Sequence, residues 1–375
     1  LALARTVFGL QGALPLVPWC KANIDYSAAN EYVHAHYHDN NNNNKNHEHS
    51  HKKCESDDQP YFSHSPLSGG GVVVDEPIYD ARLGVYDFER KCMTKPSFQQ
   101  CGFSLHSAPT MVTDWKDLDQ IRTRYLTELR AIIPLAFSEE EHNQEISHIY
   151  FYHPMFRGEN NVISNTNHDL SSSPTAPVAS LVHIDTDVGA YSVEELVRLI
   201  ERNHIIDDDQ QVSSSFPHQE IIDSIQSGCR FAIVNAWRNA DFRFPVERAP
   251  LAILGTKYSN DDERVGFPDA KSDPNRSLWY TFSKLMSDEC LLFKQYDRSI
   301  EMPSDLWHCA LAVGEDGVGQ PRTSFDIRAF VVFREKVPPE LDRFGRERTR
   351  PNLSLRESEC FCRLQSLDRQ VPSGA

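Results

Sequence analysis

A histidine and an aspartate two residues apart, His183 and Asp185, have the types and spacing that suit metal chemistry. They lie in an apolar run, and in an extended strand the side chains at i and i+2 share one face. His183 and Asp185 are therefore expected to point the same way, with Val182 and Ile184 on the opposite side. One imidazole and one carboxylate are two of the three ligands in the facial triad of non-haem Fe(II) oxygenases.

A second histidine that would complete such a triad is His308, which lies in a later apolar run. Asp185 is preferred over Asp187 as the carboxylate ligand, because Asp187 lacks the i+2 relation to His183 and stands near the end of the run. A lone His-x-Asp pair is common by chance, and His308 beside Trp307 also suits a buried core histidine. These residues alone therefore leave a metal site and a packing role both open.

A cosubstrate with a second carboxylate, such as a 2-oxo diacid bound to Fe(II), needs a cation at its far end. A guanidinium suits this role because its planar fork meets a carboxylate through two parallel hydrogen bonds. Arg322 follows His308 across a glycine-containing turn, and we expect it on the antiparallel neighbour of the His308 strand, with Ser324 on the same face. Arg328 shares this parity and is the alternative choice. An ordinary surface arginine is the competing interpretation.

The remaining pattern predicts helices mainly in the first half and strands in the second. A helix capped by Asp114 or Asp117 is expected to end at Pro134, and a capping box at Ser192 opens a helix that ends near Asn203. Residues 149–152 read as a strand that leads to His153 and Arg157 in a loop. Further strands are predicted at 231–234, 251–254, 290–296, 308–313 and 325–333.

This order of elements favours an α+β fold with a double-stranded β-helix core, the jelly-roll architecture of cupin-like proteins, and flanking helices. We expect an N-terminal segment at 1–71, an oxygenase domain at 72–337 and a charged C-terminal extension at 338–375. The first segment contains a His/Asn-rich insertion at 32–65. Such a tract can chelate metal, but a disordered loop is the preferred interpretation because no regular backbone fixes its ligands.

Charge and cysteine content exclude some classes of protein. The formal net charge of -16 opposes general binding to nucleic acid or to an anionic membrane, both of which need a surplus of Lys and Arg. The 9 cysteines show no paired zinc-type spacing, so reduced thiols in a cytoplasmic protein are expected. We read Cys360 and Cys362 as a coincidental pair. No apolar run reaches the length of a transmembrane helix.

Several sequence blocks carry a family resemblance. The most specific is Arg-Phe-Ala-Ile-Val-Asn-Ala-Trp-Arg at 230–238, and others are Trp-Tyr at 279–280, Val-His-Ile-Asp at 182–185 and Arg-Thr-Ser at 322–324. In this order they resemble the AsaB-like hydroxylase/desaturase family, the fungal gibberellin-desaturase-related Fe(II)/2-oxoglutarate dioxygenases of secondary metabolism. The resemblance spans approximately residues 77–333.

The resemblance implies His183, Asp185 and His308 as the catalytic iron ligands, with Fe(II), 2-oxoglutarate and O2 as cofactors and cosubstrates. It also implies that Arg322 with Ser324 anchors 2-oxoglutarate. Three residues match the family's Asn-x-Trp-Arg-Pro signature: Asn235, Trp237 and Arg238. The Asn and Arg of this signature either line the pocket or tie strands together, and Arg238 joins Arg328 as a further candidate for cosubstrate binding.

Two departures from the family pattern lie outside the expected triad and leave the substrate open. Asn239 replaces the signature proline, and Leu254-Gly255 stands where the family often has Cys-Asp. The expected activity is hydroxylation or desaturation of a small-molecule secondary metabolite, with no nucleic-acid or membrane partner. The alternative is a non-catalytic, cupin-like binding subunit of a biosynthetic complex, and a homo- or hetero-oligomer is compatible with either.

Overall fold

The structure is a computed structural model, and it describes most of the residues between 73 and 345. The described residues are 20–25, 73–87, 90, 92–138, 145–158, 173–180, 182–185, 188, 191–205, 216–256, 277–311 and 319–345. The His/Asn-rich insertion, Asp187, and residues 346–375 of the expected C-terminal extension lie outside this set. The described start of that extension, Pro339–Leu341, is a 3-10 turn, and Phe344 after it is buried.

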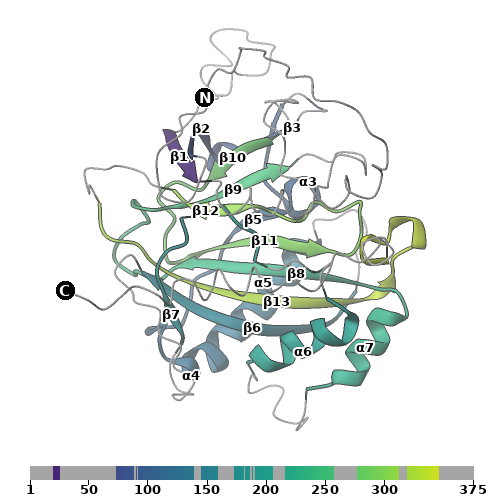
Figure 1. Ribbon diagram of the computed structural model, residues 1–375. Helices are drawn as coiled ribbons and strands as arrows, with labels where there is room; N and C mark the ends of the chain where they lie inside the picture. Colours follow the sequence, from purple (N-terminus) through teal and green to yellow (C-terminus); the bar gives the residue numbers. More distant parts are fainter. Residues whose placement is uncertain are drawn as a thin grey trace, which may run out of the picture.

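Two β-sheets stacked on one another form the body of the protein (Figure 1). The larger sheet has 6 strands in the order β5-β11-β8-β13-β6-β7, and the smaller has 5 in the order β1-β2-β10-β9-β12. The larger sheet contains β5 (Phe103–Ser107), β6 (Ile146–Gly158), β7 (Thr175–Ala176), β8 (Cys229–Asn239), β11 (Glu289–Asp297) and β13 (Thr323–Lys336). The smaller contains β1 (Cys20–Asp25), β2 (Val73–Asp80), β9 (Leu251–Thr256), β10 (Ser277–Thr281) and β12 (His308–Ala310). A separate hairpin pairs β3 (Val85–Asp87) with β4 (Cys92–Thr94).

The second half of the chain passes repeatedly between the two sheets. Strands β8, β11 and β13 belong to the larger sheet, whereas β9, β10 and β12 belong to the smaller one. Strand β12 pairs with β9, and β13 pairs with β8 and β6. The expectation that Arg322 and His308 lie on antiparallel neighbours is therefore wrong. The His308 strand belongs to the smaller sheet, whereas the strand that Arg322 precedes belongs to the larger one.

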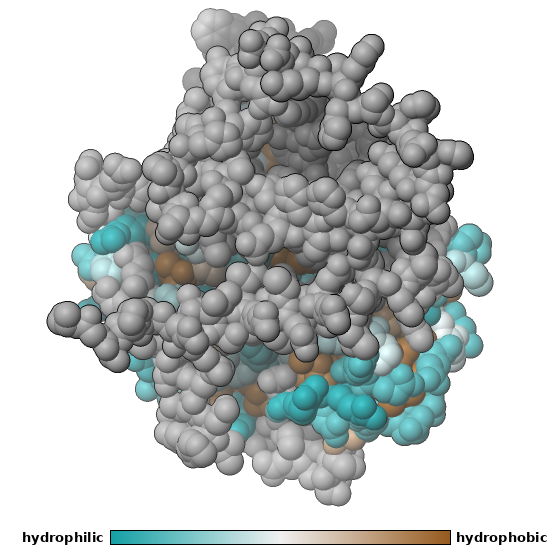
Figure 2. All heavy atoms as spheres, in the orientation of Figure 1, coloured by the Kyte–Doolittle hydropathy of each residue, from teal (hydrophilic) through white to brown (hydrophobic). Residues whose placement is uncertain are grey.

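Helices cover one face of the larger sheet, and they also cover the part of its other face that does not face the smaller sheet. Helix α5 (Leu126–Ser138) packs on one face, against the even-numbered side chains of β8 such as Val234 and Ala236. Helices α6 (Val193–Asn203) and α7 (His218–Gln226) pack against Phe231 and Ile233 on the other face. In the view of Figure 2 the region over α6 and α7 is mostly hydrophilic, with hydrophobic residues beside it towards the sheet.

The first predicted helix does not end at Pro134. A one-turn helix α4 (Leu118–Gln120) leads through the π-helical turn Ile121–Tyr125 into α5, and Pro134 lies inside α5. The last turn persists because Ala136 and Phe137, which follow the proline, are buried in the core beneath the helix. Asp117, one of the two expected caps, accepts hydrogen bonds from the backbone at the start of α4.

Other local predictions fare differently. The capping box at Ser192 is confirmed, because its hydroxyl accepts from the Glu195 amide and α6 ends at Asn203. His153 and Arg157, expected in a loop, lie within β6. The strand continues through His153 by means of a bulge at which His153 has a positive φ of 56°, an uncommon backbone conformation for a residue with a side chain. The sequence analysis did not predict helix α7 or the short helix α3 (Phe98–Cys101).

A buried ion cluster joins β8 to the end of β11. The Arg230 guanidinium donates to both carboxylate oxygens of Asp297 at 2.9 and 2.5 Å, and Lys294 Nζ donates to Asp297 Oδ2 at 3.1 Å. All three side chains are at most 1% exposed. Burial by itself raises the pKa of Asp297, but the two cations outweigh it and lower the pKa to about 2. The carboxylate is thus charged in the folded protein.

We predict that Asp297→Asn destabilises the fold by about 3–5 kcal/mol, because it leaves two buried cations without their counter-ion. Urea unfolding at pH 7 measures this loss. Because the pKa of Asp297 is lower in the folded state, its contribution is present above a pH of about 4 and is lost as the pH falls toward 2. Asp119→Asn, which removes an exposed carboxylate beside Arg122, is the control and leaves stability unchanged. Equal unfolding midpoints for Asp297→Asn and the wild type would contradict the assignment.

Candidate metal centre

His183, Asp185 and His308 converge between the two sheets. Each offers one ligand atom, and the three atoms lie within 4.8 Å of one another. The His183 Nε2 lies 3.7 Å from Asp185 Oδ1, and the His308 Nε2 lies 3.6 Å from Asp185 Oδ2. In the described part of the chain this is the one group of three such residues with metal-ligand spacing.

The three donors fit a divalent transition metal. Ligand atoms about 2.0–2.2 Å from one ion are about 3 Å apart when they meet at right angles, and farther apart at wider angles. The observed separations of 3.6 and 3.7 Å are within a small side-chain movement of this geometry. Two imidazoles and one carboxylate on one side of an ion also leave coordination positions open on the other side.

A pair of backbone hydrogen bonds brings the two histidines together. The His183 amide donates to the His308 carbonyl at 3.1 Å, and the His308 amide donates to the His183 carbonyl at 3.0 Å. The expected strand at 182–185 is thus reduced to a single antiparallel bridge on the edge of the smaller sheet, beside β12. The predicted alternation is confirmed. Val182 and Ile184 pack in an apolar cluster with Trp307 and Cys309, whereas His183 and Asp185 line the pocket.

The surroundings of His308 favour the neutral imidazole with its proton on Nδ1. Its Nδ1 lies 3.1 Å from the Leu306 carbonyl oxygen, which accepts only if Nδ1 carries the proton. This hydrogen bond therefore leaves the Nε2 lone pair directed at the cluster. Burial, and then the neighbouring His183, lower the pKa of His308 to about 3. A neutral imidazole is the form that binds a metal.

Three side chains fix the position of Asp185. The Arg328 Nη2 donates to its Oδ1 at 2.7 Å, and the Asn235 Nδ2 donates to its Oδ2 at 2.9 Å. The backbone amide of Asp185 donates to Gln295 Oε1 at 2.9 Å. Burial by itself raises the pKa of Asp185, but Arg328, and then the two imidazoles, outweigh it and hold the pKa well below its ordinary value. Asp185 is thus a charged carboxylate, and each of its two oxygens accepts a hydrogen bond.

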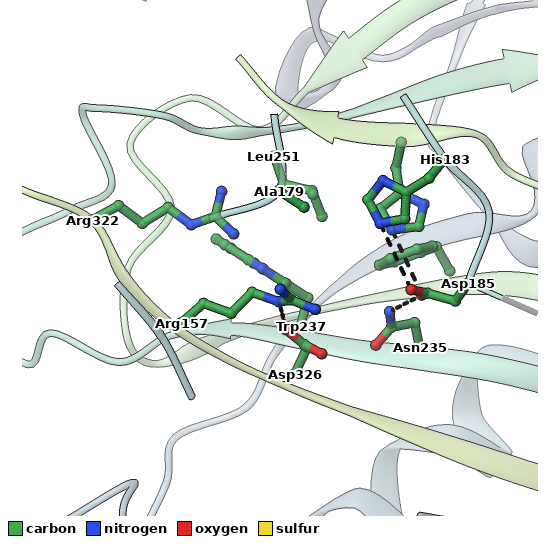
Figure 3. A pocket seen from close by; sticks show the side chains of 11 residues that line it. Arg157, Ala179, His183, Asp185, Asn235, Trp237, Leu251, Arg322 and Asp326 are labelled. Carbon is green, nitrogen blue, oxygen red and sulfur yellow. Dashed lines mark hydrogen bonds and ion pairs between the residues drawn. The ribbon is translucent and has the colours of Figure 1, made fainter. Parts of the chain in front are cut away.

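The triad forms one end of a pocket that lies between the sheets. In Figure 3, His183, Asp185 and Asn235 lie on the right of this pocket, and Arg322 and Arg157 lie on the left. The free space at this site is about 320 Å³ when the open solvent at its mouth is counted with it. Its lining residues are Arg157, Ala179, His183, Asp185, Asn235, Trp237, Leu251, Phe293, His308, Arg322 and Asp326.

The structure places Arg322 and Ser324 together, as the sequence predicts. The Arg322 Nε donates to Ser324 Oγ at 3.1 Å, and its Nη1 donates to the Ala249 carbonyl at 2.6 Å. The guanidinium carbon lies 4.9 Å from the centre of the Trp237 ring, over which it stacks. Because these contacts orient a buried cation towards the pocket, this end of the pocket suits an anionic group.

The other two arginine candidates do not lie at that end. Arg328 is committed to Asp185 and lies at the metal end. Arg238 has the opposite parity to Asn235 and Trp237 on β8, so its side chain lies on the α5 side of the sheet. There its Nη1 donates to the backbone carbonyls of Ala108 and Ser287. The expectation that Arg238 binds a cofactor therefore conflicts with its position, because residues one step apart on a strand face opposite ways.

Two charged residues of the pocket had no assigned role in the sequence. Arg157 on β6 donates through its Nε to Asp326 Oδ2 on β13, at 2.7 Å. Both line the pocket, whereas Trp279 and Tyr280 of the family resemblance do not line it and are buried elsewhere. The parity of β13 is the signal that could have found Asp326, because Asp326 alternates in phase with Ser324 and Arg328. The role of Asn235 had been left open, and its contact with Asp185 now supplies one.

Comparison with known proteins assigns the chain to a family. Residues 55–332 match the family described as "Oxidoreductase/YMDC permease-like domain", and the chain belongs to this family. None of the helices in the described residues is long and apolar enough to cross a membrane. The family description agrees with the oxidoreductase class expected from the sequence and is coarser than the AsaB-like group.

Solved structures with similarity to the chain include three of one enzyme. The "iron and alpha-ketoglutarate-dependent endoperoxidase NvfI" has a TM-score of 0.49 and 17% identity, covering 84% of this chain and 98% of that chain. A tryptophan-to-phenylalanine variant of NvfI gives a TM-score of 0.48 at 16% identity, covering 85% and 99%. NvfI in a different conformation gives 0.47 at 16% identity, covering 84% and 98%. No curated protein matches the sequence.

We predict that Asn235→Ala weakens binding of Mn(II) or Co(II) by about tenfold to a hundredfold, because residues that orient a ligand carboxylate contribute to metal affinity to about this extent. Titration calorimetry under anaerobic conditions measures the affinity. The matched variant on the same strand is Arg238→Lys, whose side chain lies on the α5 side. It lowers the unfolding midpoint and leaves metal affinity unchanged. Unchanged affinity in a folded Asn235→Ala protein would refute the positioning role.

Proposed function

We propose that the protein is an Fe(II)- and 2-oxoglutarate-dependent oxygenase that hydroxylates or desaturates a small molecule. The observation that carries the proposal is one pocket with two complementary ends. His183, Asp185 and His308 offer a facial set of metal ligands at one end, and Arg322 with Ser324 offers an anion site at the other. A metal-chelating 2-oxo acid with a second carboxylate matches both ends.

We propose further that residues 72–337 form a double-stranded β-helix, the core of this oxygenase class. The repeated passage of the chain between two facing sheets, from β8 to β13, supports this assignment. In such a core the first two ligands and the distal histidine come from adjacent segments of one sheet, which is the relation that the His183–His308 bridge has here. The AsaB-like group remains the proposed subfamily, on the sequence blocks that carry the resemblance.

Bound iron would supply the oxidising chemistry, in which O2 and 2-oxoglutarate yield succinate and CO2 while a substrate C–H bond is oxidised. The protein's own side chains bind and orient the reactants. Arg328 and Asn235 keep the Asp185 carboxylate charged and fixed, and the Leu306 carbonyl keeps the His308 Nε2 unprotonated. Phe293 and Leu251 contribute apolar surface to the pocket wall.

On the family resemblance, a secondary metabolite is the proposed substrate class, and the product is an alcohol if oxygen is inserted or an alkene if a second hydrogen is removed. The alternative is a non-catalytic, cupin-like binding subunit. A site that binds metal and 2-oxoglutarate but yields no succinate would favour this alternative.

We predict that anaerobic addition of Fe(II) and 2-oxoglutarate to the wild type produces a visible charge-transfer band, and that admitting air then releases succinate. His308→Ala abolishes both signals because it removes one of the three metal ligands. Absorption spectroscopy and quantification of succinate measure the two effects. His218→Ala is the matched control, since this histidine lies on the exposed surface of α7 beside Glu201. It leaves both signals at wild-type strength.

The wild type decides between the two functions. Absence of the band and of succinate from the folded wild type would rule out the oxygenase. A band without succinate supports the binding subunit. An undiminished band in His308→Ala would place the metal elsewhere.

A further inference from the structure

Trp237 carries a buried hydrogen-bond donor that the proposed function does not yet use. The side chain is 3% exposed, and its Nε1 has no hydrogen-bond partner among the described residues. A buried indole N–H normally finds an acceptor, because leaving it unpaired is unfavourable. Trp237 also lines the pocket, so this unpaired donor belongs to the pocket wall.

The neighbouring carboxylate does not serve as that acceptor. Trp237 on β8 lies directly opposite Asp326 on β13 in the register of the two strands. Asp326 is instead paired with Arg157, whose Nε donates to its Oδ2. The indole N–H is thus left for a group that enters the pocket.

The position of Trp237 indicates which group this is. Its ring packs under the Arg322 guanidinium, with 4.9 Å between the guanidinium carbon and the ring centre. Figure 3 shows both side chains on the side of the pocket away from His183 and Asp185. An acceptor that reaches Trp237 is therefore close to Arg322 as well. An anionic acceptor, such as a carboxylate, satisfies both residues.

Strand β8 also sets a distance between the two ends of the pocket. Asn235 contacts Asp185 at the metal end, and Trp237 is two residues farther along on the same face. Two residues of a strand span about 7 Å. Four C–C bonds, each about 1.5 Å long, separate the two carboxylate carbons of a five-carbon diacid. In the extended zigzag form these carbons are about 5 Å apart. One such molecule can therefore reach the metal end and Trp237 together.

We infer that the Trp237 indole N–H donates a hydrogen bond to the distal carboxylate of 2-oxoglutarate, beside Arg322 and Ser324. The inference rests on the proposed function and adds a residue that selects 2-oxo acids carrying a distal carboxylate. Trp237 is thus a cosubstrate-binding residue, and its contact requires no change in the oxidation chemistry.

The test compares 2-oxoglutarate with pyruvate, a 2-oxo acid that has no distal carboxylate. Calorimetric titrations of the Mn(II)-loaded full chain give both affinities. Trp237→Phe keeps an aromatic ring but removes the N–H, and it weakens binding of 2-oxoglutarate by about tenfold to a hundredfold, as expected for a hydrogen bond to a charged group. The affinity for pyruvate and for Mn(II) stays unchanged.

Trp115→Phe is the matched control. Trp115 is 2% exposed and its Nε1 also has no partner among the described residues, but Trp115 packs in the α5 core and does not line the pocket. Its replacement leaves the affinities for both 2-oxo acids unchanged. An equal loss of 2-oxoglutarate affinity in this variant would overturn the inference, because the effect would then not depend on the pocket.

A measurement on the wild type covers the case in which Trp237→Phe does not fold. The indole 15N–1H resonance of Trp237 shifts on addition of 2-oxoglutarate and does not shift on addition of pyruvate. Wild type that binds no 2-oxoglutarate overturns the proposed function itself. Wild type that binds it, while Trp237→Phe binds it equally well or loses pyruvate to the same extent, overturns only the role of Trp237.

Discussion

The two backbone hydrogen bonds between His183 and His308 are the constraint on which the candidate site depends. They join the segment around His183 to the edge of the smaller sheet, and the Ala310 amide of β12 also donates to the Ala179 carbonyl at 2.7 Å. Both imidazoles then point to the same side, with ring centres 4.3 Å apart. The outward residues Val182, Ile184, Trp307 and Cys309 pack in one apolar cluster, which holds the two segments from behind.

The charge at the centre of this arrangement is balanced before any ion binds. Asp185 is an ionised carboxylate in a largely buried position, and such a group is stable there only with compensating partners. Arg328 supplies the opposite charge, and Asn235 occupies the second oxygen. The larger sheet therefore does more than cover the site. Two of its strands carry the side chains that make a buried carboxylate tolerable, and a third, β11, contributes Gln295 to the adjacent backbone.

Local sequence patterns identified residues that converge at the candidate site, but they did not predict how the chain connects the strands that carry them. Parity identified the facing of His183 and Asp185, and the capping box identified the start of α6, because both depend on residues close in sequence. The placement of Arg322 relative to His308 was wrong, since the choice between a hairpin and a crossing to the other sheet is set by long-range pairing. Pro134 was misread for a related reason, because packing of the following residues outweighs a local preference. The contact between Asn235 and Asp185 also required the sheets to be stacked before it could be seen.

The alternation along β8 makes one strand responsible for two unrelated requirements. Asn235 and Trp237 face the pocket, while Val234, Ala236 and Arg238 face the core beneath α5. A single-residue insertion or deletion within this strand would exchange the two sets, placing a guanidinium in the pocket and an amide in the core. A change of one residue in length here therefore alters both faces of the sheet at once, whereas a point substitution alters only one.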